Sequence, residues 1–212
     1  MITPSEHAAP TLTGSVRHRF LSPHYDDIAL SCGGTATLLA RHGLKPEIRV
    51  ACGAEPDPAL PITNFATEQH RSWGLAAGQA IRQRRHEEAA AADLLGATST
   101  NLSFPDAIYR GASYQSDAQL FGKVAASEAV LPAAIAAEFH EDADDQATTR
   151  YYVPLGVGNH VDHQLCFAAG LDLAATGWDV WFYEDLPYAL VAGSVQARLD
   201  QIAASWNATA PE

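Results

Sequence analysis

Short apolar segments alternate along this chain with longer segments of helical periodicity, and this alternation restricts the fold more than any other feature. Strands are expected at 15–22, 47–53, 99–104, 151–156 and 178–185. Helices are expected at 27–43, 78–96, 116–140 and 162–177. Parallel strands need long connections, which are usually helices, so the pattern predicts an α/β fold with a Rossmann-like, mostly parallel sheet and helices on both faces. In such sheets ligands bind beyond the carboxyl ends of the strands.

The composition is that of a globular protein with a strong negative charge. The 212 residues are 47% apolar, and 25 acidic residues against 13 basic ones give a formal net charge of -12. We expect residues 1–14, which carry Pro, Ser and Thr without periodicity, to form a flexible tail and residues 15–212 to form a single domain. Nucleic acids and anionic membranes repel a strongly acidic protein, so neither is an expected partner.

The cysteine usage and the N-terminal segment both bear on the compartment. The chain has 3 cysteines, none of them in a Cys-x-x-Cys spacing. An odd number without that spacing argues against a disulfide framework and fits a reducing compartment. The first residues lack an apolar stretch of signal-peptide length, and no run of about 18 apolar residues occurs. We therefore expect a cytoplasmic protein, with homo-oligomerisation left open.

The stretch "SPHYDDIALSCGG" places His24, Asp26 and Asp27 where the first strand ends and a helix begins. Two neighbouring carboxylates repel each other unless a positive charge lies between or beside them. A metal ion would supply that charge. The alternative is structural, because acids at a helix start can cap the helix and interact favourably with its dipole.

A second motif, "PLGVGNHVDHQL", follows a later strand and contains His160 and His163. Taken alone, these histidines fit surface residues at the start of a helix. Both motifs lie at strand ends, however, and each is followed by a helix. The sheet should therefore bring the two motifs together.

The combined motifs have the residue types of a catalytic zinc site. Such a site has three protein ligands, drawn from His and acidic residues, with a fourth position open to water. His24, Asp27 and His163 would supply the ligands. Asp26 would then accept a proton from water, and His160 would stabilise an oxyanion or protonate a leaving group.

Together these segments resemble the PIG-L or LmbE-like deacetylases, a family of zinc enzymes that remove N-acyl groups from amino sugars and related amides. "SPHYDD" with its following glycine pair is similar to the family's His-Pro-Asp-Asp loop, and "HVDH" is similar to its His-Pro-Asp-His. "SFPDAIYRG" is similar to a Phe-Pro-Asp segment of the family. "RHEEAAAADLLGA" matches the family's Arg-x-x-Glu and Leu-Gly helix through Arg85, Glu88, Ala92, Leu95 and Gly96.

The resemblance implies a role for each residue of the two histidine motifs. Asp26 would be the general base, and Asp27 would be a zinc ligand together with His24 and His163. His160 would act on the oxyanion or on the leaving amine.

The resemblance also implies that Asp162 orients a histidine. The chain departs from the family pattern in several places. Tyr25 and Val161 replace prolines of the two motifs, and Ile28 replaces a common glutamate. Gly158 stands where some family members carry a tyrosine that assists the oxyanion, so a tyrosine with that role would have to come from elsewhere.

Further polar residues are expected near the substrate. We expect Asp106, after the third strand, to contact substrate, although it could simply begin a turn. Arg85 is expected to contact substrate or, equally, to pair with Glu88 one helical turn away. Glu184 and Asp185, which end the last strand, are expected at the rim of the substrate site.

The sequence thus predicts a zinc-dependent N-deacetylase that acts on a small N-acylated amino sugar or glycoside. Two alternatives remain. A Rossmann-type cofactor-binding module should carry Gly-x-Gly-x-x-Gly after the first strand, which "CGG" does not supply. A non-catalytic metal-binding module is compatible with the sequence, although the retention of both Asp26 and His160 counts against it.

Overall fold

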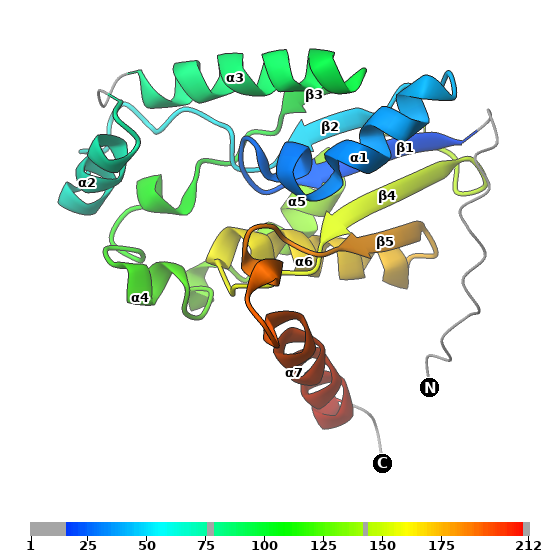
Figure 1. Cartoon of the computed structure of the whole chain (residues 1–212). Coiled ribbons are helices and arrows are strands. Elements are labelled where there is room, and N and C mark those ends of the chain that lie inside the picture. The colour runs from blue at the N-terminus through cyan, green and yellow to red at the C-terminus, as the bar shows by residue number, and fades with distance from the viewer. Residues whose placement is uncertain (1–15, 76–78, 142–143, 210–212) are drawn as a thin grey trace.

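The computed structural model describes residues 16–75, 79–141 and 144–209, and a parallel five-stranded sheet forms its centre (Figure 1). The order of the strands is β3-β2-β1-β4-β5. They are β1 (Arg17–Ser22), β2 (Glu47–Val50), β3 (Thr98–Asn101), β4 (Thr149–Pro154) and β5 (Asp179–Tyr183). The predicted α/β fold with a parallel sheet is confirmed.

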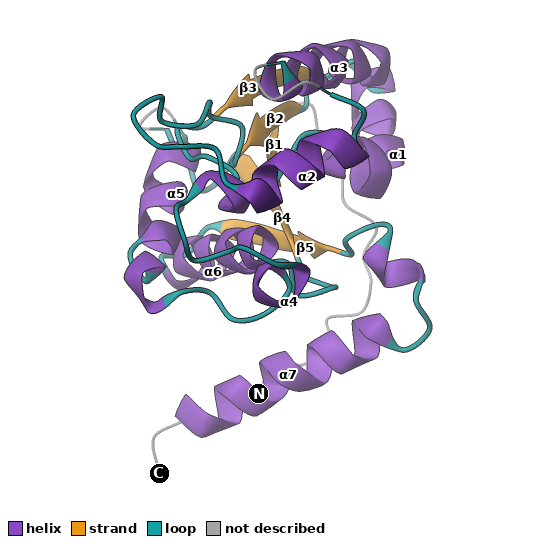
Figure 2. Ribbon diagram, turned by 90° about the vertical axis from the view of Figure 1, so that its left-hand side faces the viewer, coloured by secondary structure: helices purple, strands orange, loops and turns teal. Residues whose placement is uncertain are grey.

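Helices cover both faces of the sheet (Figures 1 and 2). The helices α1 (Asp27–Arg41) and α3 (Ala80–Leu95) lie on one face, and α5 (Leu131–Phe139) and α6 (Val161–Ala175) lie on the other. Successive side chains of a strand point to opposite faces. Phe20 therefore packs in the core beneath α1 and α3, whereas the next residue, Leu21, packs in the core beneath α5 and α6.

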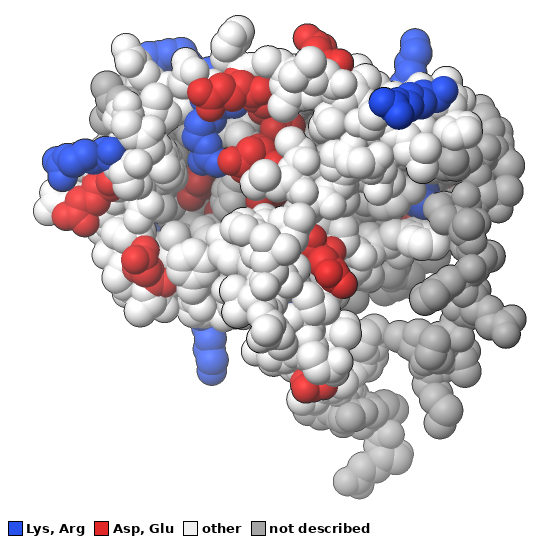
Figure 3. Space-filling model, in the orientation of Figure 1, with Lys and Arg blue, Asp and Glu red and all other residues white. Residues whose placement is uncertain are grey.

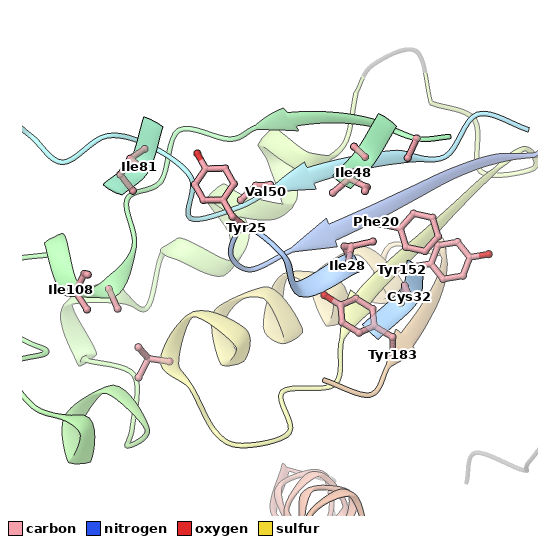
Figure 4. Packing of buried hydrophobic residues seen from close by; sticks show 14 of the residues in the cluster. Phe20, Tyr25, Ile28, Cys32, Ile48, Val50, Ile81, Ile108, Tyr152 and Tyr183 are labelled. Carbon is pink, nitrogen blue, oxygen red and sulfur yellow. The ribbon is translucent and has the colours of Figure 1, made fainter. Parts of the chain in front are cut away.

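The core on the α1 side is continuous from the sheet into the helix (Figure 4). Phe20 of β1 stacks on Tyr152 of β4, with 4.3 Å between the ring centroids and 8° between the ring planes. Ile28 and Cys32 from α1 belong to the same cluster. This packing fixes the first turn of α1, and with it the loop that joins β1 to α1.

The connections contain short helices. These are α2 (Asn64–Ser72) and α4 (Asp117–Leu120), with 3-10 turns η1 (Ala107–Tyr109) and η2 (Ala126–Glu128). After β5 follow the 3-10 turn η3 (Tyr188–Leu190) and the 16-residue helix α7 (Ser194–Thr209). None of the described helices is long and apolar enough to cross a membrane. The flexible tail expected at 1–14 lies outside the described residues, and the single domain over 15–212 stays a prediction.

The prediction of one helix over 116–140 is wrong. Ser116 does cap a helix, because its side chain accepts a hydrogen bond from the Gln119 N–H. The helix that it caps, α4, ends after one turn. The chain turns at Gly122, and regular helix resumes only in α5.

The order in which the chain adds strands to the sheet reverses between β1 and β4. The chain passes from β1 to β2 and β3 on one side, and β4 and β5 lie on the other side of β1. Phe20 is paired in register with Ile48 of β2 and with Tyr152 of β4. The loops that follow β1 and β4 therefore leave neighbouring strands at the same edge, which is the usual position of a ligand site in such a sheet.

Candidate metal centre

The loop after β1 is shaped by hydrogen bonds to its own backbone. The hydroxyl of Ser22 donates to the carbonyl of His24 at 2.6 Å, and the His24 N–H donates to Asp27 Oδ2 at 2.8 Å. Asp26 has a φ of 81°, and its N–H donates to Glu88 Oε2 at 2.9 Å. As a result the Asp27 side chain is directed into the protein, whereas the Asp26 side chain is 66% exposed.

The loop after β4 places His160 at the start of α6. Asn159, with a φ of 66°, donates from Nδ2 to the carbonyls of Phe121 and Gly122. His160 is the N-cap of α6, and its Nδ1 accepts a hydrogen bond from the Asp162 N–H at 3.2 Å. Both loops therefore reach the carboxyl edge of the sheet with their side chains fixed by local contacts.

The sheet brings the three candidate metal ligands within reach of one another. Asp27 Oδ2 lies 3.6 Å from His24 Nδ1 and 3.5 Å from His163 Nε2. In a tetrahedral site with bonds of about 2.0–2.1 Å, neighbouring ligand atoms are roughly 3.3–3.4 Å apart. The two distances from Asp27 are close to this spacing, but among the described residues the groups whose three ligand atoms all lie within 4.8 Å of one another are that of His24, His160 and His163 and that of His24, Asp106 and Asp162. His160 lies close by, since His24, His160 and His163 each offer a nitrogen within 4.8 Å of the other two.

A carboxylate holds the far nitrogen of two of these histidines. Asp162 Oδ2 lies 2.8 Å from His24 Nε2, and Asp185 Oδ1 lies 2.6 Å from His163 Nδ1. Such carboxylates fix the orientation of a metal-binding ring and make its other nitrogen more basic. The sequence analysis gave this role to Asp162 but placed Asp185 at the substrate rim. The signal for Asp185 was its position two residues after the end of β5, the neighbour of β4.

The electrostatics of the group favour a cation. Burial by itself disfavours a charged His24, but the carboxylates of Asp106, Asp162 and Asp27 outweigh it and raise the pKa of His24 to about 9. Burial also opposes ionisation of Asp162, yet Arg110 and His24 hold the pKa of its carboxyl well below the usual range. The carboxylates around His24 thus create a negative potential that a divalent cation would neutralise.

His160 is held as a neutral hydrogen-bond donor. Burial lowers the pKa of its imidazole well below the usual value, and the neighbouring His24 lowers it further. Because Nδ1 accepts a hydrogen bond, a neutral ring carries its proton on Nε2. The Nε2–H group can donate to an oxygen that gains negative charge during a reaction.

Asp26 lines a small pocket of about 160 Å³ together with Arg84 of α3. Arg84 Nη2 lies 3.9 Å from Asp26 Oδ1, and its guanidinium lies over the rings of Tyr25 and Trp73. Desolvation raises the pKa of the Asp26 carboxyl, an effect that solvent access weakens. A solvent-exposed carboxylate can accept a proton from water. Sequence reasoning missed Arg84, which directly precedes the residue that it chose.

Asp106 lies at the edge of the ligand group. Its Oδ2 is 3.8 Å from His24 Nε2, and its Oδ1 accepts a hydrogen bond from the Ile108 N–H. His24, Asp106 and Asp162 form a second group whose atoms are close enough to hold a metal. The oxygens of Asp162 are already engaged by Arg110 and His24, so this second group fits a metal less well.

The other two expected substrate contacts lie further from the group. Arg85 donates to the hydroxyl of Tyr25 at 3.3 Å and to the carbonyl of Gly53 at 3.2 Å, so it supports the loop after β1. Glu184 is exposed, and within residues 16–75, 79–141 and 144–209 it makes no hydrogen bond or ion pair with the ligand group. The structure therefore does not bring Glu184 to the site.

Tyr188 of η3 lies against Gly158. A Cβ atom at Gly158 would come within 2.4–2.8 Å of the Tyr188 side chain. The Tyr188 ring meets the rings of His163 and Phe121 edge-on, at 5.9 and 6.0 Å between centroids. Burial and the nearby Asp27 raise the pKa of Tyr188 to about 12, so its hydroxyl stays protonated. An aromatic side chain thus occupies the space that Gly158 leaves beside the ligand group.

A cavity of about 300 Å³ lies next to the site. Its lining residues are Glu55, Pro56, Asp57, Pro58, Leu60, Ile62, His70, Ala80, Ile81, Arg82 and Tyr109. The ligand candidates do not line it, but Tyr109 belongs to the turn that Asp106 caps, so the two regions share η1. On the face shown in Figure 3, acidic side chains gather around a recess at the loops beyond the strands.

The fold and the site together define an α/β protein with a histidine–aspartate group at the carboxyl ends of β1 and β4. The chain matches, over residues 19–174, the model of a family described as PIG-L, GlcNAc-PI de-N-acetylase. The chain belongs to this family, and the resemblance seen in the sequence is confirmed.

The relatives of the chain include two 2'-N-acetylparomamine deacetylases. The one from Niallia circulans is 31% identical over 190 residues, which cover 80% of this chain and 66% of the relative. The one from Streptomyces fradiae is 31% identical over 182 residues, which cover 82% of this chain and 58% of the relative. The chain thus spans less than two thirds of the length of either relative.

A solved structure of a teicoplanin deacetylase in a zinc-inhibited form has a similar fold. Its TM-score to this chain is 0.71, with 27% sequence identity over 84% of this chain and 71% of the other.

Proposed function

We propose that this chain is a metal-dependent hydrolase that removes an N-acetyl group from an amino sugar within a small glycoside. The observation that carries the proposal is the position of Asp27 Oδ2 within 3.6 Å of His24 Nδ1 and 3.5 Å of His163 Nε2, with a nitrogen of His160 close by. Asp26, the neighbour of Asp27 in the chain, is exposed to solvent. The deacetylases of N-acetylparomamine and teicoplanin among the similar proteins support the amino-sugar substrate.

His24, Asp27 and His163 are the proposed ligands, and zinc is the proposed metal because nitrogen and carboxylate donors suit it. When bound, a divalent metal supplies a Lewis acid for the amide carbonyl and makes water easier to deprotonate. The name of the similar teicoplanin deacetylase structure refers to inhibition by zinc. The metal analysis in the test below therefore also identifies which metal the active protein holds.

The residues around the ligands divide the remaining chemistry between them. Asp26 accepts a proton from water as the water oxygen adds to the acyl carbon. The Nε2–H group of His160 donates to the carbonyl oxygen as it becomes an oxyanion, and the Tyr188 hydroxyl is a candidate for a second donor. The C–N bond then breaks, the amine leaves with the proton that Asp26 took from the water, and the acyl group leaves as an acid that ionises to a carboxylate.

The cavity beside the site is the proposed position of the rest of the substrate. Asp106, at the turn between the ligand group and the cavity, is a candidate for holding a sugar hydroxyl. The cytoplasmic location, homo-oligomerisation and the lack of nucleic-acid and membrane partners stay predictions.

Asp26→Asn tests the proposal, because the amide has the shape of the carboxylate but cannot accept the proton. We expect the variant to bind one metal per chain, like the wild type, and to lose about 100- to 10,000-fold in turnover. Acetate release from a panel of N-acetyl amino sugars measures turnover, and metal analysis is made on the same samples. Asp172→Asn, on the exposed side of α6, is the control and should match the wild type.

Two results would point to the alternative functions. A wild-type chain that holds metal but releases no acetate from any substrate of the panel would favour a non-catalytic metal-binding module. A chain that binds nucleotide cofactors but no metal would favour a Rossmann-type cofactor-binding module. Wild-type turnover by Asp26→Asn would show that the base lies elsewhere.

A further inference from the structure

The Arg110 guanidinium lies between two carboxylates, one of which, Asp162, holds the proposed metal ligand His24. Its Nη1 is 2.6 Å from Asp162 Oδ1. Its Nε and Nη2 donate to the two oxygens of Glu128 at 2.8 and 3.1 Å. The side chains of Arg110 and Glu128 are each 9% exposed, and that of Asp162 is fully buried. A guanidinium suits this arrangement because it presents its donors in a fixed planar fork.

Arg110 holds the oxygen of Asp162 that has no other partner. Asp162 Oδ2 contacts both His24 Nε2 at 2.8 Å and the Ala107 N–H at 3.0 Å. For Oδ1, the described part of the chain offers no hydrogen bond beyond the ion pair with Arg110. Without Arg110 the carboxylate could rotate about its Cβ–Cγ bond, and Oδ2 would lose its alignment with His24.

Glu128 is itself fixed, which restricts the movement of Arg110. The Tyr114 hydroxyl donates to Glu128 Oε2 at 2.7 Å and accepts from the Ala125 N–H at 2.9 Å. The Arg110 guanidinium also lies over the Tyr114 ring and donates to the carbonyl of Pro105. The bend that interrupts the helix expected over 116–140 therefore carries Glu128 to Arg110.

We propose that Arg110 is a positioning residue of the metal site, acting with Glu128 through Asp162 on the ring of His24. This inference rests on the proposed metal site. Arg110 does not touch the metal position, but it sets the direction of a ligand and therefore the affinity for a divalent metal. Mutation of a residue that holds a metal ligand typically changes metal affinity by about 10- to 100-fold. A role through charge alone would have the opposite sign, because the loss of a nearby positive charge would strengthen cation binding.

The test compares zinc affinities of the whole chain, freed of metal and titrated with zinc in competition with a coloured chelator. Arg110→Met keeps a long side chain but removes the charge and the donors. We expect it to weaken zinc binding by about 10- to 100-fold. Arg110→Lys restores the charge without the fork, so it should recover only part of the loss. The visible spectrum of bound cobalt(II) should change in Arg110→Met, because the direction of one ligand changes.

Arg150→Met is the matched control. Arg150 Nε lies 2.7 Å from Asp179 Oδ2, and its guanidinium lies over the ring of Trp181. Like Arg110→Met, this variant loses an arginine ion pair and a ring contact. The lost contacts join β4 to β5, and none of them reaches His24. Its zinc affinity and its cobalt(II) spectrum should equal those of the wild type.

Glu128→Gln covers the case in which Arg110→Met does not fold, because it keeps the shape of the side chain and removes only its charge. Glu128→Gln should also weaken zinc binding, by a smaller factor than Arg110→Met. The proposal is overturned if the foldable variants bind zinc as tightly as the wild type, or more tightly, or if Arg150→Met shows the same loss. A wild type that binds no divalent metal refutes the metal site and this proposal with it. A wild type that binds zinc without deacetylating refutes only the proposed activity.

Discussion

Two residues of the site loops, Asp26 and Asn159, adopt the left-handed backbone conformation. This conformation costs a residue with a Cβ atom free energy, so it persists only where the surroundings hold it. Glu88 holds the N–H of Asp26, and the carbonyls of Phe121 and Gly122 hold the side chain of Asn159. Asp26 lies in the first histidine motif, and Asn159 directly precedes His160 of the second. The left-handed conformation of each residue sets the direction of the side chains that follow it.

Sequence reasoning identified the residues of these motifs from their types and from their positions at strand ends. The resemblance gave Asp162 as a partner that orients a histidine, but the orienting roles of Glu88, Arg110 and Asp185 were missed, because these residues come from other segments of the chain. Their contacts depend on the packing of helices and turns against the sheet edge, which spacing within a motif does not encode.

Gly158→Ala is expected to destabilise the protein by about 1–3 kcal/mol, because the new Cβ meets both a positive φ and the Tyr188 ring. Displacement of Tyr188 should also lower turnover. Gly34→Ala is the control, because the Cβ there would meet no atom within 4 Å and alanine favours the interior of α1. Urea unfolding of both variants provides the comparison, and equal stabilities would contradict the assigned packing of Tyr188.

At the scale of elements, the strands and the long helices α1, α3 and α6 follow the expected positions to within a few residues. Most of these elements carry apolar residues that pack in the two cores, whereas β3, with the sequence TSTN, is the exception. The helices α2 and α7 were not expected from the sequence. For α2 the signal was the capping residue Thr63, whose side chain accepts a hydrogen bond from the Ala66 N–H, since the helix itself is short and polar.

Thr63→Ala is expected to weaken α2 by about 1 kcal/mol, because the Ala66 N–H loses its acceptor. The helix carries His70, which contacts the hydroxyl of Tyr109 and lines the cavity beside the site. Amide hydrogen exchange in α2 should become faster. Thr67→Ala, one turn later and exposed, should leave the exchange unchanged or slower because alanine is the better helix former there. Equal exchange in the two variants would contradict the capping role.

At the scale of the whole molecule, charged side chains gather in a second place besides the site. The site lies at the carboxyl edge of the sheet. Buried Arg19 of β1 lies on the α5 and α6 side and contacts three carboxylates. These belong to Glu47, Glu141 and Asp144. Arg49 of β2 also contacts Glu141. One carboxylate thus joins two neighbouring strands to the segment that follows α5.

This arrangement makes the stability depend on acid pH through Glu141. Hydrogen bonds from Arg49 and then from Arg19 lower the pKa of Glu141 from 4.5 to about 2. A folded-state pKa below the unfolded-state value means that the ionised carboxylate stabilises the fold. This contribution is complete above pH 4.5 and is lost as the pH falls from 4.5 to about 2. The side chain is 46% exposed, so water and salt reduce the size of the effect.

Glu141→Gln should therefore be less stable than the wild type near pH 6, and the difference should shrink as the pH falls from 4.5 toward 2. Urea unfolding at a series of pH values measures the difference in free energy of unfolding. Glu68→Gln is the control, since Glu68 is exposed on α2 and makes no ion pair among the described residues. Its difference from the wild type should stay constant over the same range. Acid removes the charge of Glu141 in the wild type, but glutamine has no charge to lose. If the difference in free energy of unfolding between Glu141→Gln and the wild type does not change with pH, the charge of Glu141 contributes nothing to stability, which contradicts the prediction.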